Sequence, residues 1–210
     1  MDDNNFMRIY YSDLISEKYI KLINKFLTFK SVCIVPSYLQ TKDWRKKQKW
    51  YINGKHNECE TYQKSLLLNI ITKSNIKELY FKTYERINLE NYEITIMKNP
   101  LNENNGLEYT EDFDAKILLK NNNLLYINLK FICDKGGMQT RSLREVYHFV
   151  KAQLEYLKKK NNDKIYFINI CDGDTCFDFR QYFAYLINNK KNCYFFDMHD
   201  FRLWFNHNFI

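Results

Sequence analysis

Residues 108–157 read EYTEDFDAKILLKNNNLLYINLKFICDKGGMQTRSLREVYHFVKAQLEYL, and residues 164–174 read KIYFINICDGD. The apolar runs at 113–119 and 124–133 are separated by the polar residues 120–123, a pattern that predicts an antiparallel β-hairpin. Acidic residues stand at the start of the first run. The hairpin is therefore expected to present carboxylates where its first strand begins.

A long helix and a buried strand are predicted to follow this hairpin. Apolar residues recur at helical spacing over 140–160, and residues 165–170 form an almost unbroken apolar run, typical of a strand buried on both faces. Elsewhere the sequence predicts helices over 12–30, 57–74 and 177–188, strands over 79–84, 92–97 and 193–196, an extended piece over 32–35 and a terminal amphipathic segment. The order helix, three-stranded meander, helix, strand predicts an α/β (α+β) fold in which helices flank a mixed central sheet.

Length and charge bound the domain organisation and the partners. A chain of 210 residues is long enough for one domain with a hydrophobic core and too short for two ordinary ones. We expect a core over 56–200, preceded by a helical and basic extension over 1–55. Lys and Arg total 32 against 25 Asp and Glu, a net charge of +7. This excess favours a polyanionic partner, because phosphate contacts release counterions.

The sequence shows no sign of export or of membrane insertion. Its first residues, MDDNN, are acidic and polar, unlike a secretory signal peptide. No apolar run approaches the roughly 20 residues that a membrane helix requires. The six cysteines lie among apolar residues, and reduced, buried thiols are the expected state. These features predict a cytoplasmic protein without a membrane partner.

The hairpin carries residues suited to phosphodiester hydrolysis, which requires a metal ion held by carboxylates and a nearby cation that steers water. Asp114 stands at the start of the first strand and is a candidate metal ligand. On the second strand, Asn128 and Lys130 are two residues apart and project to one face of the sheet. The backbone carbonyl of Leu129 lies between them and is a further candidate ligand. Oxygen donors of this kind suit Mg²⁺, with Mn²⁺ as an alternative.

These residues resemble the motif of the PD-(D/E)xK nuclease superfamily and, within it, the type II restriction endonucleases. The resemblance covers about residues 55–200 and implies an αβββαβ core. Asp114 matches the first acidic position, and Lys130 matches the lysine. Glu60 matches an acid often found on the helix before the meander, and Asp172-Gly173 matches the DG pair that ends the corresponding strand in several restriction enzymes.

One position departs from the superfamily pattern. Asn128 occupies the place of the second carboxylate, and a neutral amide is a weaker metal ligand. Some members of the superfamily carry this acid on the neighbouring helix, which makes Glu145 the first candidate replacement and Glu60 the second. Glu111 or Asp112 is a further alternative. If none of them serves, the chain is an inactive descendant that only binds DNA.

Two segments are candidate DNA contacts. The loop over 134–141 contains paired glycines that let backbone approach a phosphate, and the next helix would direct its N-terminal amides at an anion. Residues 44–50 interleave four cations with two tryptophans, which suits a nucleic-acid backbone. In each segment, solvated surface charges are the alternative interpretation. The candidate DNA-binding residues are Lys135, Gln139, Arg141, Arg144, Arg45, Lys46, Lys47 and Lys49.

The sequence thus predicts a Mg²⁺-dependent, sequence-specific endodeoxyribonuclease of the type II restriction kind that acts on double-stranded DNA. The resemblance implies that Asp114 and a second acid hold the metal and that Lys130 positions the attacking water. A palindromic site would require a homodimer, and a cognate DNA methyltransferase would be the functional partner. The alternatives are a structure-specific repair or recombination nuclease of the same fold, a ribonuclease, and a non-catalytic DNA-binding module.

Overall fold

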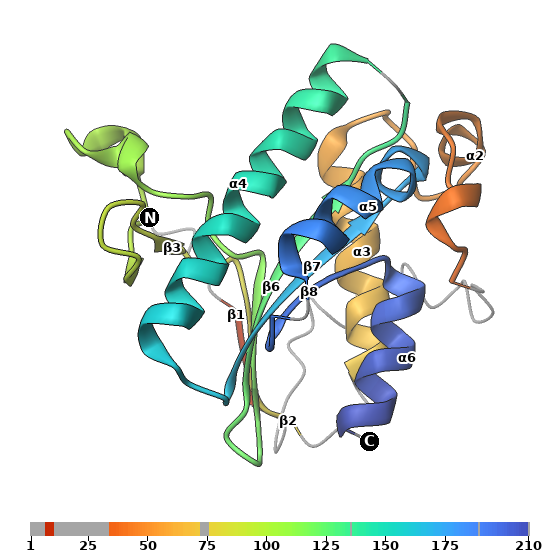
Figure 1. The fold of residues 1–210 in the computed structure, drawn as a ribbon. Helices are drawn as coiled ribbons and strands as arrows, with labels where there is room; N and C mark the ends of the chain where they lie inside the picture. Colours follow the sequence, from red (N-terminus) through yellow and green to blue (C-terminus); the bar gives the residue numbers. More distant parts are fainter. Residues whose placement is uncertain (1–6, 11–33, 72–75, 135, 189, 210) are drawn as a thin grey trace, which may run out of the picture.

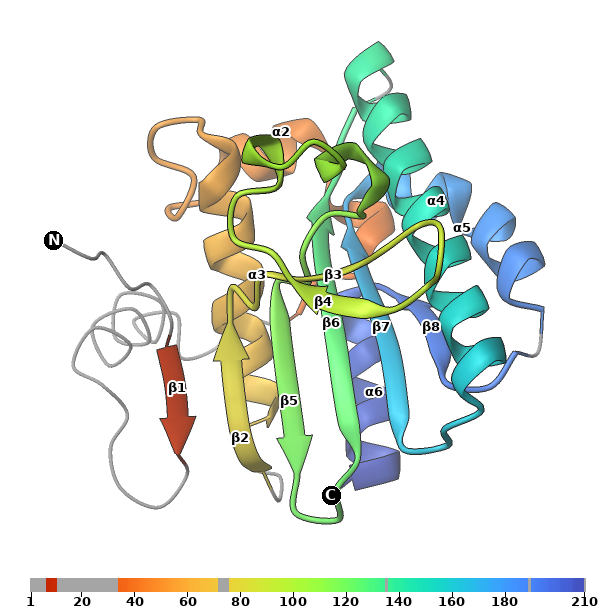
Figure 2. The same cartoon turned by 90° about the vertical axis from the view of Figure 1, so that its left-hand side faces the viewer.

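The structure is a computed structural model that describes residues 7–10, 34–71, 76–134, 136–188 and 190–209. Its centre is a six-stranded sheet with the order β1-β2-β5-β6-β7-β8 (Figures 1 and 2). The strands are β1 (Met7–Tyr10), β2 (Ile76–Phe81), β5 (Ala115–Leu119), β6 (Leu124–Phe131), β7 (Ile165–Asp172) and β8 (Cys193–Phe196). The pairs from β1 to β6 are antiparallel, whereas β6–β7 and β7–β8 are parallel. The sheet is therefore mixed, as predicted.

Helices cover both faces of this sheet (Figures 1 and 2). One face packs against α3 (His56–Ile71) and α6 (Met198–Phe209), and the other packs against α4 (Gly137–Lys160) and α5 (Asp174–Ile187). Successive side chains of a strand point to opposite faces. Accordingly, Leu125 and Ile127 belong to the core beneath α3, and Tyr126 belongs to the core beneath α4. The predicted α/β class, with helices flanking a mixed sheet, is confirmed.

The succession α3, β2, β5, β6, α4, β7 follows the predicted order of helix, three strands, helix and strand. Strands β5 and β6 form the predicted hairpin, in which Ala115 lies opposite Ile127. In its polar turn, Asn122 has a φ of 65°, a left-handed conformation that asparagine tolerates well. The β5–β6 hairpin places Asp114, immediately before β5, beside the last residues of β6.

A lobe formed by residues 82–113 is inserted between β2 and β5. It contains the two-stranded sheet of β3 (Glu85–Ile87) and β4 (Ile94–Ile96) and two short 3-10 helices, η2 (Pro100–Asn102) and η3 (Gly106–Glu108). The strand predicted over 92–97 is thus part of this separate sheet and not of the central one. Positive φ angles at Lys82 and Tyr84 turn the chain away where β2 ends.

Residues 34–55 pack against one end of the central sheet. They contain the 3-10 helix η1 (Ser37–Leu39) and the short helix α2 (Lys42–Lys46). Trp50 is buried and stacks on Tyr62 with ring centroids 4.3 Å apart, and Trp44 lies nearly parallel to Phe131 at 6.4 Å. The two tryptophans therefore anchor this segment to α3 and β6. The helix predicted over 12–30 lies outside the described residues, and residues 34 and 35 of the predicted extended piece are not in a strand.

Two predictions about the environment concern helices and thiols. Within the described ranges, no helix has the length and apolar character needed to cross a bilayer. The described cysteines are buried free thiols, in agreement with the prediction; they are Cys59, Cys133, Cys171, Cys176 and Cys193. Cys33 lies outside the described residues.

Candidate active site

Charged side chains from three elements meet at the end of the sheet where β5 begins and β6 ends. Asp114 precedes β5, Lys130 is the penultimate residue of β6, and Glu60 lies on α3. Figure 2 shows that α2, the 3-10 helices of the lobe and the first turns of α4 all lie at this end of the molecule. The hairpin therefore brings the predicted acid and the predicted lysine together, and Glu60 lies close enough to Asp114 to influence its ionisation.

The carboxylate of Asp114 is held by the neighbouring strand. Its Oδ2 accepts a hydrogen bond of 2.7 Å from the backbone N–H of Leu129. Burial and, after it, the negative charge of Glu60 raise the pKa of Asp114 to about 7, against the opposing effects of Lys64, the Leu129 N–H and Lys130. A carboxylate whose ionisation is disfavoured by burial and by a neighbouring acid is the kind of group that a bound divalent cation stabilises.

Lys130 is directed at an acid of the lobe. Its side chain is 21% exposed and forms an ion pair with Glu111, whose side chain is half exposed. Burial lowers the pKa of Lys130, but Glu111 and then Asp114 outweigh this effect, so the net shift is upward. The ammonium thus stays charged between two carboxylates, as a group that orients water or stabilises an oxyanion must.

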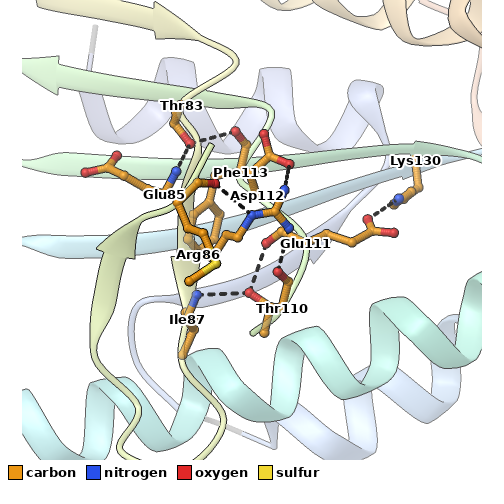
Figure 3. A network of polar contacts seen from close by, with 10 residues as sticks. Thr83, Glu85, Arg86, Ile87, Thr110, Glu111, Asp112, Phe113 and Lys130 are labelled. Atoms are coloured by element: carbon orange, nitrogen blue, oxygen red, sulfur yellow. Dashed lines mark hydrogen bonds and ion pairs between the residues drawn. The ribbon is translucent and has the colours of Figure 1, made fainter. Parts of the chain in front are cut away.

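The loop that carries Glu111 is held in place by Arg86 of β3 (Figure 3). The guanidinium donates from Nη1 to the carbonyl of Thr110 at 2.8 Å and from Nη2 to Oδ1 of Asp112 at 2.9 Å. The Thr110 hydroxyl in turn accepts from the backbone N–H of Ile87 at 3.0 Å. These bonds hold the backbone of Thr110 and the side chain of Asp112, the two neighbours of Glu111 in the chain, and thereby restrict the position of Glu111 relative to Lys130.

Lys64 is a second cation at the site, and the sequence alone did not point to it. Its ammonium lies 2.5 Å from Oε1 of Glu60, one helical turn away on α3, and its side chain is 17% exposed. Lys64 also lowers the pKa of Asp114, more than Lys130 does. The spacing of four residues from Glu60 was visible in the sequence, but the proximity of Lys64 to Asp114 depends on how α3 packs against the sheet.

Asn128 lies inside the core beneath α4. It is fully buried, and its Nδ2 donates to Oδ1 of Asn169 at 3.3 Å. Asn169 also exchanges hydrogen bonds with Gln153 of α4, at 2.7 and 3.0 Å. Oδ1 of Asn128 has no hydrogen-bond partner. The amide therefore belongs to a buried polar network. Asn128 lies two residues before Lys130, on the same face of β6.

The other predicted ligands have different surroundings. Glu145 lies on the exposed side of α4, where it forms an ion pair of 3.2 Å with Arg141, and it is not among the groups that shift the pKa of Asp114. Leu129 contacts Asp114 through its N–H. Asp112 is engaged by Arg86. Of the alternatives to Asn128 as a second acid, Glu60 is the one that the structure brings to Asp114.

The candidate DNA-binding residues lie near the same end of the sheet. On α4, Arg141 and Arg144 are exposed, and on the segment after η1 the candidates Lys46, Lys47 and Lys49 are exposed too. Arg45 is half-buried, with its guanidinium 4.9 Å from the centre of the Tyr51 ring. Gln139 is half-buried in the first turn of α4, and Lys135 lies outside the described residues.

Beneath the site, the buried carboxyl of Asp172 connects the elements that carry it. Oδ1 accepts from the N–H of Met198 at 3.0 Å, and Oδ2 accepts from Nε2 of Gln63 at 2.7 Å. The same Gln63 nitrogen donates to the carbonyl of Lys130 at 3.0 Å. Burial raises the pKa of Asp172 to about 7, although the bonds from Met198 and Gln63 oppose the rise. Asp172 thus joins α3 and α6 to the end of β7.

The donors at the site suit a hard divalent cation, which takes oxygen ligands and keeps several waters. Asp114 and Glu60 supply two carboxylates, and half-exposed Glu111 is within the reach of Lys130. Among the described residues, the acids with ligand atoms all within 4.8 Å of one another are instead Asp197 and Asp200, together with His199. In that group, Asp197 already accepts from the backbone N–H groups of Ser37 and Asp200, at 3.0 and 2.7 Å. It acts as the cap of α6.

Comparisons with known proteins add no relative to this description. No protein-family model, no curated protein and no solved structure matches the chain.

Proposed function

We propose that this protein is a divalent-metal-dependent nuclease that hydrolyses phosphodiester bonds in double-stranded DNA at a defined sequence, in the manner of type II restriction endonucleases. The observation that carries the proposal is the group of Asp114, Glu60 and Lys130 at one end of the β5–β6 hairpin. The pKa of Asp114, raised to about 7 by burial and by Glu60, supports a requirement for a cation there. The αβββαβ order of the core is consistent with this proposal.

The residues have distinct roles in the proposed reaction. Asp114 and Glu60 would hold Mg²⁺, which supplies a Lewis acid for the phosphoryl oxygen and lowers the pKa of a bound water. The Leu129 N–H donates to one carboxylate oxygen of Asp114 and thereby orients the whole carboxylate. Lys130, held between Glu111 and Asp114, orients the attacking water and neutralises the charge that develops on the phosphate.

The charge distribution supports a nucleic-acid substrate. Exposed cations on α4 and next to α2 flank the end of the sheet that carries Asp114, and lysine and arginine contacts to phosphates supply most of the affinity for a duplex. If the recognition site is palindromic, the active form is a homodimer, since protein symmetry mirrors site symmetry. A cognate DNA methyltransferase would then protect the host sequence.

Cleavage of plasmid and phage DNA in Mg²⁺ tests the proposal. We expect discrete fragments that disappear with EDTA and with Lys130→Ala, whereas Lys158→Ala, which removes an exposed lysine of α4, cleaves normally. A smear in place of bands would support the repair or recombination nuclease. Intact DNA, with RNA degraded in parallel, would support the ribonuclease. Full activity of Lys130→Ala would refute the assigned role of Lys130.

A second function is favoured by Asn128. The position of the second carboxylate is an amide whose surroundings are the buried network of Asn169 and Gln153, which suits a DNA-binding module without catalysis. In that case, gel-shift binding of the duplex would survive Asp114→Ala unchanged. No cleavage would appear in Mg²⁺ or Mn²⁺.

A further inference from the structure

The two lysines of the candidate site have different partners. Lys130 forms its ion pair with Glu111, which comes from the lobe. Lys64 forms its ion pair with Glu60 at 2.5 Å, and its ammonium lies 5.8 Å from the centre of the Phe81 ring. Lys64 is therefore paired directly with Glu60, one of the two proposed metal ligands, and its charge also acts on the other, Asp114.

The position of Lys64 is that of a replaceable counter-ion. Its side chain is largely covered, yet Glu60 is 38% exposed, so the pair borders on solvent. A single lysine–carboxylate pair in such a place contributes little net stability, and four rotatable bonds let the ammonium move without unwinding α3. Two carboxylates attract a divalent cation far more strongly than they attract a single ammonium group. The cation would therefore take Glu60 away from Lys64.

We propose that Lys64 neutralises Glu60 and Asp114 in the metal-free protein, releases Glu60 when a divalent cation binds, and then contacts a phosphate oxygen of the DNA. The inference rests on the proposed nuclease function and adds a residue to the same site. A released ammonium next to a metal ion is repelled by it and attracted by an anionic substrate. The contact with the face of the Phe81 ring keeps the ammonium at the site after its release.

The test measures Mn²⁺ binding without DNA, by isothermal titration calorimetry, and separately measures DNA cleavage. In Lys64→Gln, Mn²⁺ should bind about tenfold more tightly, the order expected for one competing charge at ion-pair distance after solvent screening. Cleavage at saturating Mg²⁺ should fall by about tenfold or more, because a cation that contacts the phosphate is lost. Lys64→Arg, which keeps the charge, should bind Mn²⁺ with wild-type affinity.

Lys158→Gln is the matched control, since it removes one charge and one intrahelical ion pair on α4 and should change neither quantity. If Lys64→Gln binds Mn²⁺ with unchanged affinity, or cleaves normally, the role of Lys64 is refuted, while loss of Mn²⁺ binding in Asp114→Asn would still uphold the metal site. If wild-type protein binds no Mn²⁺, or binds it equally well in Asp114→Asn, the proposed metal site is itself refuted, and the role of Lys64 with it.

Discussion

Replacing Asp172 by asparagine should change how the stability of the protein depends on pH. The carboxyl is fully buried, and its pKa rises from 3.8 to about 7 on folding. Above pH 4 the unfolded chain has lost this proton, whereas the native state keeps it until about pH 7. Unfolding therefore releases a proton in this window, and the free energy of unfolding falls as the pH rises through it.

The size of the effect follows from the same shift. Each pH unit in which only the native state holds the proton is worth about 1.4 kcal/mol. From pH 5 to pH 8 the wild-type protein should lose about 2.5 kcal/mol through Asp172 alone. In Asp172→Asn this loss is absent. At pH 5, however, the variant should be about 1–3 kcal/mol less stable, because its amide nitrogen would face Nε2 of Gln63, which in the wild type donates a hydrogen bond to Oδ2 of Asp172.

Urea unfolding of both proteins at pH 5, 6, 7 and 8, in EDTA, measures the difference directly. Asp114 also has a pKa near 7, but its titration is common to the two proteins and cancels in the difference. Between pH 5 and pH 8, the free energy of unfolding of the variant should rise by about 2.5 kcal/mol relative to that of the wild type. Asp163→Asn, at an exposed site, is the control and should show a constant difference. A constant difference for Asp172→Asn would refute the raised pKa.

Three further substitutions have defined outcomes. Arg86→Met should lower the free energy of unfolding in urea by about 2–4 kcal/mol, since it leaves half-buried Asp112 and the Thr110 carbonyl unpaired. It should also lower DNA cleavage more than Arg86→Lys does. Equal activity of the two variants would argue that Arg86 does not position Glu111. Gly173→Ala should lower the free energy of unfolding by about 3 kcal/mol or more, because φ is +101° and a Cβ would lie 2.1 Å from the Ile132 carbonyl oxygen. Wild-type stability of this variant in thermal unfolding would contradict the expectation. Asn128→Asp should destabilise the protein by about 3 kcal/mol or more at pH 8, where a buried carboxylate would lack hydrogen-bond donors. The same variant should not raise DNA cleavage. A higher cleavage rate would mean that Asn128 occupies the position of a lost metal ligand.

The fold could be predicted where one local pattern decides it. The turn over 120–123, the helical periodicity of α4 and the apolar run of β7 each allow a single structure, and all three are observed. The strand over 92–97 was predicted, but the separate lobe that contains it was not, because β3 and β4 are three residues each and are stabilised by contacts distant in sequence. Glu93, for example, pairs with Lys159 and Lys160 of α4, a contact that no local pattern contains.

The same distinction separates the residues of the candidate site. Asp114 and Lys130 are placed by the register of one hairpin, which the turn fixes, so their proximity followed from the sequence. Lys64 and Glu111 reach the site through the packing of α3 and through the Arg86 network of the lobe. The spacing of Lys64 from Glu60 is a local signal, but the approach of Lys64 to Asp114 and that of Glu111 to Lys130 have none, so the sequence did not point to Lys64 and left Glu111 among several alternatives.

The surroundings of Asn128 explain why a second acid would come from a helix. Asn128 and Lys130 share one face of β6, but α4 covers the position of Asn128, and its neighbours there are the amides of Asn169 and Gln153. An amide fits that network, whereas an ionised carboxylate would be buried without a cation. Lys130 is two residues further along β6, near the end of the strand, and Glu60 of α3 lies close enough to Asp114 to raise the pKa of its carboxyl. Under the proposed function, Glu60 of α3 would be the acid that the hairpin lacks, with Lys64 as its counter-ion.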